Sequence, residues 1–368
     1  MKNTFGNTLT VTLFGESHGE MIGAVLDGLC PGLPIEEESI NDWLRVRRPA
    51  SAADTARREP DEYRIVSGVY RGKTTGTPLC ILIPNKDAHG EGYEKQYGQA
   101  RPSHADYTAY CKYHGFEDPR GGGHFSGRIT AALTAAGALL APSLKRLGIT
   151  LGTHIKSCAG ISDRSFSGTE QDLFPLCRTH FPVLNPESGA AMEQAILRAH
   201  QNGNSVGGVT ETMITGTPAG VGEPWFDSVE GMLSHALFSI GGIKGVEFGD
   251  GFAFADSEAP ACNDAFRMEN GAVVTKTNHN GGINGGITNG MPILFRCAVK
   301  PTPSVALPQE TVNFLKRENT GITVIGRHDP AIIRRICPVI NSVTTLVLCD
   351  LLAGRYGTDL FLRRKEAL

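Results

Sequence analysis

A histidine between two glycines, near the start of the chain, is the first candidate for acid–base chemistry. It is His18, in the motif GESHG at residues 15–19, which directly follows an apolar run at 9–14. Glycines let the backbone approach a ligand closely, and an imidazole with a reference pKa of about 6.5 suits proton transfer near neutral pH. The alternative is a histidine that is hydrogen-bonded only within its own turn.

A second histidine has charged neighbours on both sides. The motif RPSHAD at 101–106 places Arg101 three residues before His104, and Asp106 two residues after it. An arginine binds anions, and a carboxylate orients an imidazole, so this motif predicts an anion site with an acid–base group. A polar surface turn set by Pro102 is the alternative.

The glycine-rich motif DPRGGGHFSGR at 118–128 is the strongest sign of a bound anion. It leads into a predicted helix at 129–147, whose first N–H groups and dipole favour negative charge. Arg120 and Arg128 add formal charge at the same place. The segment therefore predicts a phosphate-type site, against the alternative of a flexible surface loop.

Three later motifs add cations, glycines and titratable groups in predicted loops. They are NGGINGG at 280–286, KPTPS at 300–304 and RHDP at 327–330. Several loops that converge on one pocket are typical of enzymes for polyanionic substrates. A nucleotide site is not predicted, because GVYRGKT at 68–74 has three residues between its glycines instead of four and G-x-G-x-x-G does not occur.

Hydrophobic patterning predicts the elements that position these motifs. Alternating runs predict strands at 9–14, 64–69, 78–84, 207–215, 293–300 and 321–325. Besides 129–147, helices are expected from Asp227, where Glu230 completes a possible capping box, and from Pro338 to about Gly354. Strands and helices without a regular βα alternation favour an α+β fold.

A short internal echo indicates two similar halves. TTGTPL at 74–79 resembles TNGMPI at 288–293, and each leads into an apolar strand. A repeat of this kind, if it reflects duplication, predicts two similar sets of strands and helices built around one another.

Composition excludes several classes of protein. The 368 residues include 35 Lys+Arg and 38 Asp+Glu, and this balance argues against non-specific nucleic-acid binding. Nine cysteines without a C-x-x-C pair or a signal sequence predict a cytoplasmic protein with reduced thiols and no metal site. The apolar window at 129–144 is too short to span a bilayer, so no membrane segment is predicted.

Taken together and in order, these motifs resemble the chorismate synthase family over nearly the full chain. The motifs that carry the resemblance are GESHGEMIGAVLDG from Gly15, REPDEYRIVSGVYRGKTTGTP from Arg58, RPSHADY, RGGGHFSGR, GVEFGDGF from Gly245, GGINGGI, KPTPS and GRHDP. The resemblance implies a β-α-β sandwich with an internal duplication, in one domain over 1–368, assembled as a homotetramer.

The resemblance also implies a reaction. It is a 1,4-anti elimination of phosphate from 5-enolpyruvylshikimate 3-phosphate, a phosphorylated dicarboxylate, to give chorismate in the last step of the shikimate pathway. The reaction needs reduced FMN without net redox change. The chain has no room for a separate reductase domain, so an external flavin reductant is expected.

Roles follow by position from the same resemblance. His18 would protonate reduced flavin near N1, His104 would protonate the departing phosphate, and Asp329 would assist proton removal at flavin N5. Arg47 matches a position linked to substrate and, in some members, NADPH. Further substrate-binding candidates are Arg101, Arg120 and Arg128. The FMN-binding candidates are His124, Phe125, Ser126, Gly241, Gly242, Gly285, Lys300, Pro301, Thr302, Pro303, Ser304 and Arg327.

The glycine-rich loop departs from the family pattern RGGGRSSARET. An arginine is replaced by His124, a serine by Phe125 and a glutamate by Ile129, and Gly241 stands where an asparagine is usual. Each lost charged hydrogen bond is expected to weaken anion binding by about 1–3 kcal/mol. Two alternatives therefore stay open: a flavin- or anion-binding relative with weak activity, and an NADPH-dependent flavin reductase, which the lack of a nucleotide motif disfavours.

Overall fold

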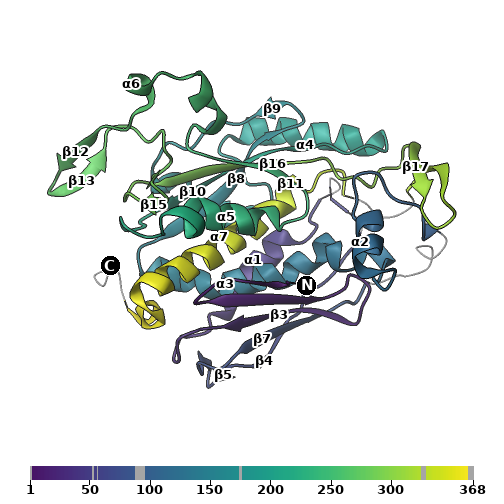
Figure 1. Cartoon of the computed structure of the whole chain (residues 1–368), viewed down its shortest axis with the longest axis horizontal. Helices are drawn as coiled ribbons and strands as arrows, with labels where there is room; N and C mark the ends of the chain where they lie inside the picture. Colours follow the sequence, from purple (N-terminus) through teal and green to yellow (C-terminus); the bar gives the residue numbers. More distant parts are fainter. Residues whose placement is uncertain are drawn as a thin grey trace.

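Two antiparallel sheets enclose a layer of helices in the computed structural model (Figure 1). The structure describes residues 2–51, 54–55, 57–87, 96–173, 176–324 and 329–363. Strands and helices are mixed along the chain, and the helices pack on the inner faces of both sheets. The α+β class and the β-α-β sandwich predicted from the sequence are therefore confirmed.

The first sheet has five strands in the order β1-β2-β3-β7-β4. Their bounds are β1 Thr4–Phe5, β2 Thr10–Gly15, β3 Met21–Asp27, β7 Leu79–Pro84 and β4 Arg64–Ser67. Along β7, buried and partly exposed residues alternate, and Leu79, Ile81 and Ile83 are the buried ones. Because side chains alternate between the two faces of a strand, β7 buries one apolar face against the helices.

The second sheet has five strands in the order β9-β8-β10-β16-β11. Their bounds are β9 Ile161–Ser162, β8 Thr150–Cys158, β10 Gly208–Thr215, β16 Ile293–Val299 and β11 Ile243–Phe248. Four two-stranded hairpins lie outside the sheets. They are β5 Val69–Tyr70 with β6 Lys73–Thr74, β12 Phe266–Glu269 with β13 Ala272–Thr275, β14 Ile283–Asn284 with β15 Ile287–Thr288, and β17 Gln309–Asn313 with β18 Glu318–Ile322.

The two halves of the chain repeat the same arrangement. The two sheets have corresponding strand orders, β1-β2-β3-β7-β4 and β9-β8-β10-β16-β11. The fourth position is held by β7 in the first sheet and by β16 in the second. The echo seen in the sequence repeats at atomic level. Thr74 Oγ1 accepts from the Leu33 N–H at 2.9 Å and donates to a carbonyl at 2.6 Å, and Thr288 Oγ1 does the same with Val221 at 2.9 Å and a carbonyl at 2.6 Å. The internal duplication is thus confirmed.

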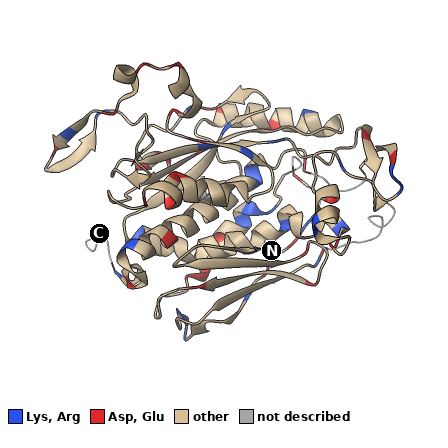
Figure 2. Ribbon diagram, in the orientation of Figure 1, with Lys and Arg blue, Asp and Glu red and all other residues tan. Residues whose placement is uncertain are grey.

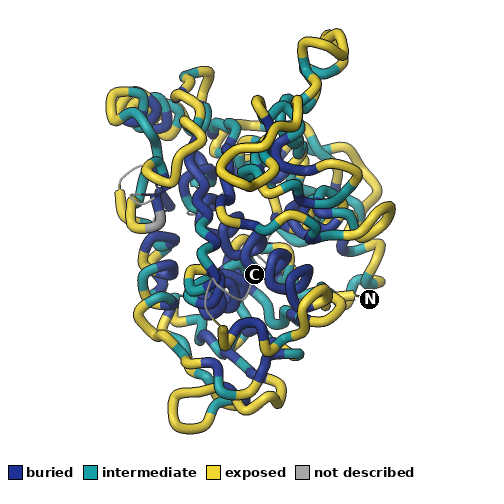
Figure 3. The backbone as a smooth tube through the Cα atoms, turned by 90° about the vertical axis from the view of Figure 1, so that its left-hand side faces the viewer, coloured by how far each residue is buried: buried dark blue, intermediate teal, exposed yellow. Residues whose placement is uncertain are grey.

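Four helices form the middle layer: α1 Glu37–Arg47, α3 Thr130–Arg146, α5 Val229–Phe238 and α7 Ile333–Tyr356. The helices α3 and α7 pack closely. A Cβ added at Gly137 of α3 would lie only 2.4 Å from Ser342 Cα of α7, so the absence of a side chain at Gly137 allows the two backbones to approach. Figure 3 shows buried backbone running through this layer. Outside it lie α2 Asp106–Tyr113, α4 Pro186–Gln201 and α6 Ala259–Cys262.

Three predicted boundaries are corrected. The helix α5 is capped by Ser228, whose Oγ accepts from the Gly231 N–H at 3.0 Å, so Asp227 does not begin it. The helix α7 starts before Pro338, since its buried apolar face continues to Ile333 and outweighs the one hydrogen bond that proline removes. The strand expected at 321–325 is β18, which pairs with β17 and ends at Ile322.

The helix α7 is long and apolar enough, by length and composition, to cross a membrane. In the structure, 94% of its most apolar window is buried between the two sheets and the other helices. A helix that is apolar on all sides is expected in the core of a large protein. We therefore interpret α7 as the central core helix.

Candidate active site

The turn between β2 and β3 places His18 against the glycine-rich loop. The Ser17 N–H donates to the Gly123 carbonyl at 3.0 Å, which fixes the turn to the loop. The His18 ring lies on Gly121, where an added Cβ would be 2.1 Å from the ring carbon Cε1. Gly121 also has φ of 58°. Only glycine fits this position, because it has no Cβ and adopts positive φ freely.

Burial lowers the pKa of His18 below its ordinary value of 6.5, and the positive charges of Arg57 and Arg120 lower it further. A nearby carboxylate, Asp118, acts weakly in the opposite direction. The imidazole is therefore mostly neutral at pH 7 in the ligand-free protein. An anion bound near the two arginines would offset their charge and favour the protonated form.

His104 is held by a carboxylate and an arginine immediately before α2. Its Nδ1 lies 2.7 Å from Asp106 Oδ1, and Arg101 donates from Nε and Nη2 to the two Asp106 oxygens at 2.8 and 2.6 Å. Because the carboxylate accepts, Nδ1 carries the hydrogen, and Nε2 lies toward Gly122. Burial alone would raise the pKa of Asp106, but the bonds from Arg101 and His104 hold it well below its ordinary range.

The two histidines meet at consecutive glycines of one loop. The segment Arg120–Phe125 forms a distorted 3-10 turn in which Gly121 contacts His18 and Gly122 contacts His104. A pocket opens beside His104, and its lining combines charged and aromatic residues, namely Arg101, Asp118, Phe125 and Phe314 among others. The aromatic side chains of this lining suit a flat aromatic ligand, and Arg101 is the guanidinium among the carboxylates of Asp106, Glu117 and Asp118.

The second half of the chain contributes Lys300 to the His104 side of the site. Lys300 follows β16, and its Nζ donates to the Ser103 carbonyl at 2.6 Å. Its backbone N–H donates to the Gly242 carbonyl at 2.9 Å, so two predicted FMN-binding segments, Gly241–Gly242 and 300–304, lie side by side. Burial, and then the charge of Lys244, lower the pKa of Lys300.

The predicted segment 300–304 also packs on the chain before β10. The Thr302 carbonyl accepts from Ser205 Oγ at 2.7 Å. A Cβ added at Gly207 would lie 2.9 Å from Pro301. Ser304 is buried, whereas Pro303 is partly exposed. These contacts fix the backbone that carries Lys300.

The departures from the family pattern in the glycine-rich loop have structural roles. His124 Nδ1 lies 2.8 Å from the Gly15 carbonyl, so this imidazole ties the loop to the end of β2. The Phe125 ring is 43% exposed and meets Tyr113 edge to face at 6.1 Å. Ser126 Oγ accepts from the Arg128 N–H at 3.3 Å. His124 thus donates to the protein through Nδ1.

Asp329 lies where the end of α1 meets the start of α7. Its Oδ1 accepts from the Thr55 N–H at 2.9 Å, and its Oδ2 pairs with Arg335 Nη1 at 2.6 Å. Arg335 also donates from Nε to the Arg47 carbonyl at 3.1 Å. Figure 2 shows that Lys and Arg gather at these facing helix ends in the middle of the molecule.

The four predicted substrate-binding arginines fall into two groups. Arg101 lines the pocket, and Arg120 is 44% exposed while it pairs with Asp118 at 2.8 Å. Arg47 and Arg128 are 3% and 6% exposed, and both reach the buried carboxylate of Asp61. Burial lowers the pKa of Arg47 to about 9, although Asp61 opposes this shift. Substrate contact by this buried pair stays a prediction.

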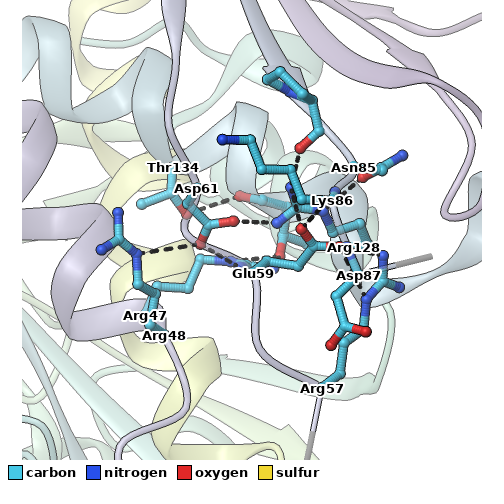
Figure 4. A network of polar contacts seen from close by, with 12 residues as sticks. Arg47, Arg48, Arg57, Glu59, Asp61, Asn85, Lys86, Asp87, Arg128 and Thr134 are labelled. Carbon is cyan, nitrogen blue, oxygen red and sulfur yellow. Dashed lines mark hydrogen bonds and ion pairs between the residues drawn. The ribbon is translucent and has the colours of Figure 1, made fainter. Parts of the chain in front are cut away.

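Sequence reasoning missed a network of charged groups beneath the His18 turn (Figure 4). Arg57 donates to Ser17 Oγ at 2.8 Å and to the Ser17 carbonyl at 3.0 Å, and Glu59 holds Arg57 at 2.7 Å. Asn85 joins the same network through Arg128. The run REPDEY displays the carboxylates in the sequence, and Arg57 stands next to it. The other partners of Glu59 and Asp61, among them Arg128, lie far away along the chain.

One predicted FMN-binding residue of the described segments, Gly285, is not brought to the histidines. Gly285 lies in the turn between β14 and β15, on the opposite side of Figure 1 from α2, which follows His104. Arg327 lies outside the described residues. Within the described ranges, no group of three or more His, Cys, Asp or Glu side chains is arranged to hold a metal ion.

A change at Asp106 tests the geometry around His104. The Asp106→Asn variant removes a carboxylate that accepts two arginine bonds, so the free energy of unfolding is expected to fall by about 1.5–3 kcal/mol at pH 7. Because the folded pKa of Asp106 is depressed, its stabilisation is present above the unfolded pKa of about 3.9 and is lost as pH falls toward the folded value. Urea unfolding at pH 7 and pH 3 measures this, and an equal deficit at both would contradict it.

Comparisons with known proteins agree with the motifs. A family model described as chorismate synthase matches residues 9–353. Chorismate synthase from Pyrococcus abyssi is 41% identical over 352 residues, covering 95% of this chain and 97% of that protein. Chorismate synthase from Methanosarcina mazei is 42% identical over 349 residues, covering 95% of each. A crystal structure of a chorismate synthase superposes with a TM-score of 0.75 at 28% identity, covering 96% of this chain and 94% of the other.

Proposed function

Because this chain belongs to the chorismate synthase family and is a lyase of that kind, we propose that it eliminates phosphate from 5-enolpyruvylshikimate 3-phosphate to give chorismate. The observation that carries the proposal is the placement of His18 and His104 on consecutive glycines of one loop. Two titratable groups with different surroundings at one site are what an acid–base elimination needs.

Reduced FMN fits the residues that lie around the pocket. Phe125 and Phe314 offer apolar faces, while Arg101 and Lys300 offer positive charge at the same loops. When bound, reduced FMN supplies the electron density that assists loss of phosphate from an allylic carbon, without net redox change. The segments proposed to hold it are 124–126, Gly241–Gly242 and 300–304.

His104 is proposed to give a proton to the departing phosphate from Nε2. Asp106, at 2.7 Å from Nδ1, keeps the ring in one orientation and stabilises the charged imidazolium. Arg101 holds this carboxylate in place through two donated bonds. The negative charge of the leaving group thus forms beside groups that are already oriented, which is the usual source of electrostatic catalysis.

His18 and Asp329 are proposed to move protons on the other side of the site. His18 is neutral before ligands bind, and an anion near Arg57 and Arg120 would favour its protonation. Asp329 keeps its two oxygens on Thr55 and Arg335, so its carboxylate is fixed in position as a proton acceptor.

The remaining parts of the proposal concern assembly and surroundings. We propose that residues 1–368 act as one domain in a cytoplasmic homotetramer, with flavin reduced by an external source. The support is that one contiguous apolar core joins both sheets and the middle helices. The separation of Gly285 from the histidines also agrees with a site completed by another subunit.

An anaerobic assay tests the proposed function. Purified protein with photoreduced FMN and 5-enolpyruvylshikimate 3-phosphate is expected to release phosphate, while oxidised FMN gives none. If folded protein releases no phosphate at saturating reduced FMN, the chain is instead a relative that binds flavin or anions with little activity. NADPH oxidation that needs flavin but no substrate would point to a flavin reductase.

The loop departures give a separate prediction about cofactor affinity. Restoring the family residues with His124→Arg and Phe125→Ser is expected to tighten FMN binding about tenfold or more, because a charged hydrogen bond to an anion is regained. Calorimetric titration with FMN measures the change. His114→Arg, on the exposed end of α2, adds the same charge outside the loop and is the control. Equal effects of both changes, or none, would contradict a specific role for residue 124.

A further inference from the structure

We propose that Asn85 is a positioning residue for the His18 turn, residues 15–19. The inference rests on the proposed function, since it concerns how the His18 imidazole is held for proton transfer. Asn85 directly follows β7, and its amide nitrogen Nδ2 donates to the Glu16 carbonyl at 3.0 Å and to the Gly19 carbonyl at 2.8 Å. The two bonds bracket Ser17 and His18, so one amide group fixes both ends of the turn.

The orientation of this amide is determined by Arg128. Its Nε donates to Asn85 Oδ1 at 2.8 Å, and a guanidinium has only donors, so Oδ1 must face it (Figure 4). Both hydrogens of Nδ2 then point to the turn. Arg128 is itself held by Asp61 and by the Pro84 carbonyl at 3.2 Å. The buried arginine therefore acts on the site through Asn85.

The backbone around Asn85 is fixed as firmly as its side chain. The Asn85 N–H donates to the Glu20 carbonyl at 3.1 Å. The next two N–H groups, of Lys86 and Asp87, donate to the buried carboxylate of Glu59 at 2.9 and 3.2 Å. An amide whose side chain and backbone are both held leaves little freedom to the turn that it binds.

The glycine-rich loop holds the opposite side of the turn. The Ser17 N–H bonds to Gly123, and the His18 ring rests on Gly121. Without Asn85, the Glu16 and Gly19 carbonyls lose the donor that they share. The turn is then held at Ser17, by the loop and by Arg57, and the segment that carries the His18 ring can shift relative to the loop. Displacement of a catalytic group by about 1 Å is enough to lower a rate 10²-fold, so the position of the ring matters as much as its presence.

The duplicated half of the chain uses a comparable device for the other histidine. β16 occupies in the second sheet the place that β7 has in the first. Lys300, immediately after β16, donates to the Ser103 carbonyl at 2.6 Å, next to His104. Asn85 after β7 and Lys300 after β16 thus stand at equivalent places in the two halves. Each binds the backbone beside one of the two histidines.

The variant Asn85→Asp tests this role, because it keeps the size and the acceptor for Arg128 but turns the two donated bonds into repulsive contacts. We expect kcat for phosphate release to fall about 10- to 100-fold. We also expect the His18 pKa, followed by NMR of the imidazole, to rise, because a negative charge and a looser turn both favour the protonated ring. Asn85→Gln, which keeps the donors at a longer reach, is expected to recover part of the rate.

The matched control is Asn278→Asp in the second half of the chain. Asn278 also donates from its side-chain amide to a backbone carbonyl, that of Pro292 at 2.8 Å. It should leave kcat and the His18 titration unchanged. If Asn85→Asp does not fold, Asn85→Ser replaces it. The same loss of kcat is expected, and the His18 pKa is expected to rise less, because only the looser turn acts on it. Unchanged kcat and unchanged His18 titration in the Asn85 variants would overturn the inference. The wild-type protein could also show no turnover, while the His18 titration still differs between the wild type and the Asn85 variants. That result would refute the proposed function and leave the positioning role of Asn85 standing.

Discussion

Replacement of His104 by alanine is expected to lower kcat for phosphate release by about 10²–10⁴-fold, the usual range for a general acid. The His104 ring can give a proton from Nε2 while Asp106 holds its Nδ1 at 2.7 Å. The same loss is expected for His18→Ala. Steady-state assays at saturating reduced FMN measure both variants.

The control for these variants is His200→Ala, at the exposed end of α4. Its kcat should equal that of the wild type. Retention of full activity by both site variants would remove the two histidines from the chemistry. A rise in KM with unchanged kcat would instead make them ligand-binding groups, since uniform binding alters KM alone.

The pH dependence of His18 adds an independent check on its role. Burial, with Arg57 and Arg120, places its folded pKa below the unfolded value of 6.5. Between the folded and the unfolded pKa of His18, the unfolded chain binds more protons than the folded one. His18 therefore makes folding less favourable as the pH falls below 6.5. NMR titration of the ligand-free protein should show this low pKa, and it should rise when phosphate or FMN binds.

The second large effect is expected at Asp61. The Asp61→Ala variant is expected to lower the free energy of unfolding by about 3–5 kcal/mol, because removing one partner leaves buried charges uncompensated. Asp61 is 2% exposed and faces Arg128, Arg47 at 3.6 Å and Arg48 at 3.8 Å. Urea unfolding with a fluorescence readout measures the change.

Asp42→Ala is the matched control for Asp61. Asp42 pairs with Arg45 at 3.0 Å on the surface of α1, where that arginine is 49% exposed. Exposed pairs contribute about 0–1 kcal/mol, so little change is expected there. Equal small losses in both variants would show that the buried arginines do not depend on Asp61.

Local patterning was enough to predict the strands that carry the site. β2, β7, β10 and β16 lie within one residue of their predicted bounds at each end, and α3 does likewise, because apolar periodicity is a local property. The motif GESHG was also placed correctly, at the end of β2. A single six-residue echo predicted the two similar halves. It was informative because Thr74 and Thr288 make equivalent hydrogen bonds in the two halves.

The partners of the site residues could not be predicted, because they come from distant segments. Arg128 appeared to be a free cation beside a phosphate loop, yet it is buried against Asp61, a residue 67 positions away. Asn85 carried no signal, since an asparagine after a strand is ordinarily a turn residue. The helix α7 starts before Pro338 because tertiary packing outweighs a local stop signal.

The measurement that tests the central claim most directly is a single-turnover reaction under anaerobic conditions. Enzyme with photoreduced FMN is mixed with 5-enolpyruvylshikimate 3-phosphate, and phosphate, chorismate and the flavin spectrum are followed together. We predict equal amounts of phosphate and chorismate, with the flavin still reduced at the end. Absence of both products from folded, flavin-saturated protein, or oxidation of one flavin for each phosphate released, would contradict the account.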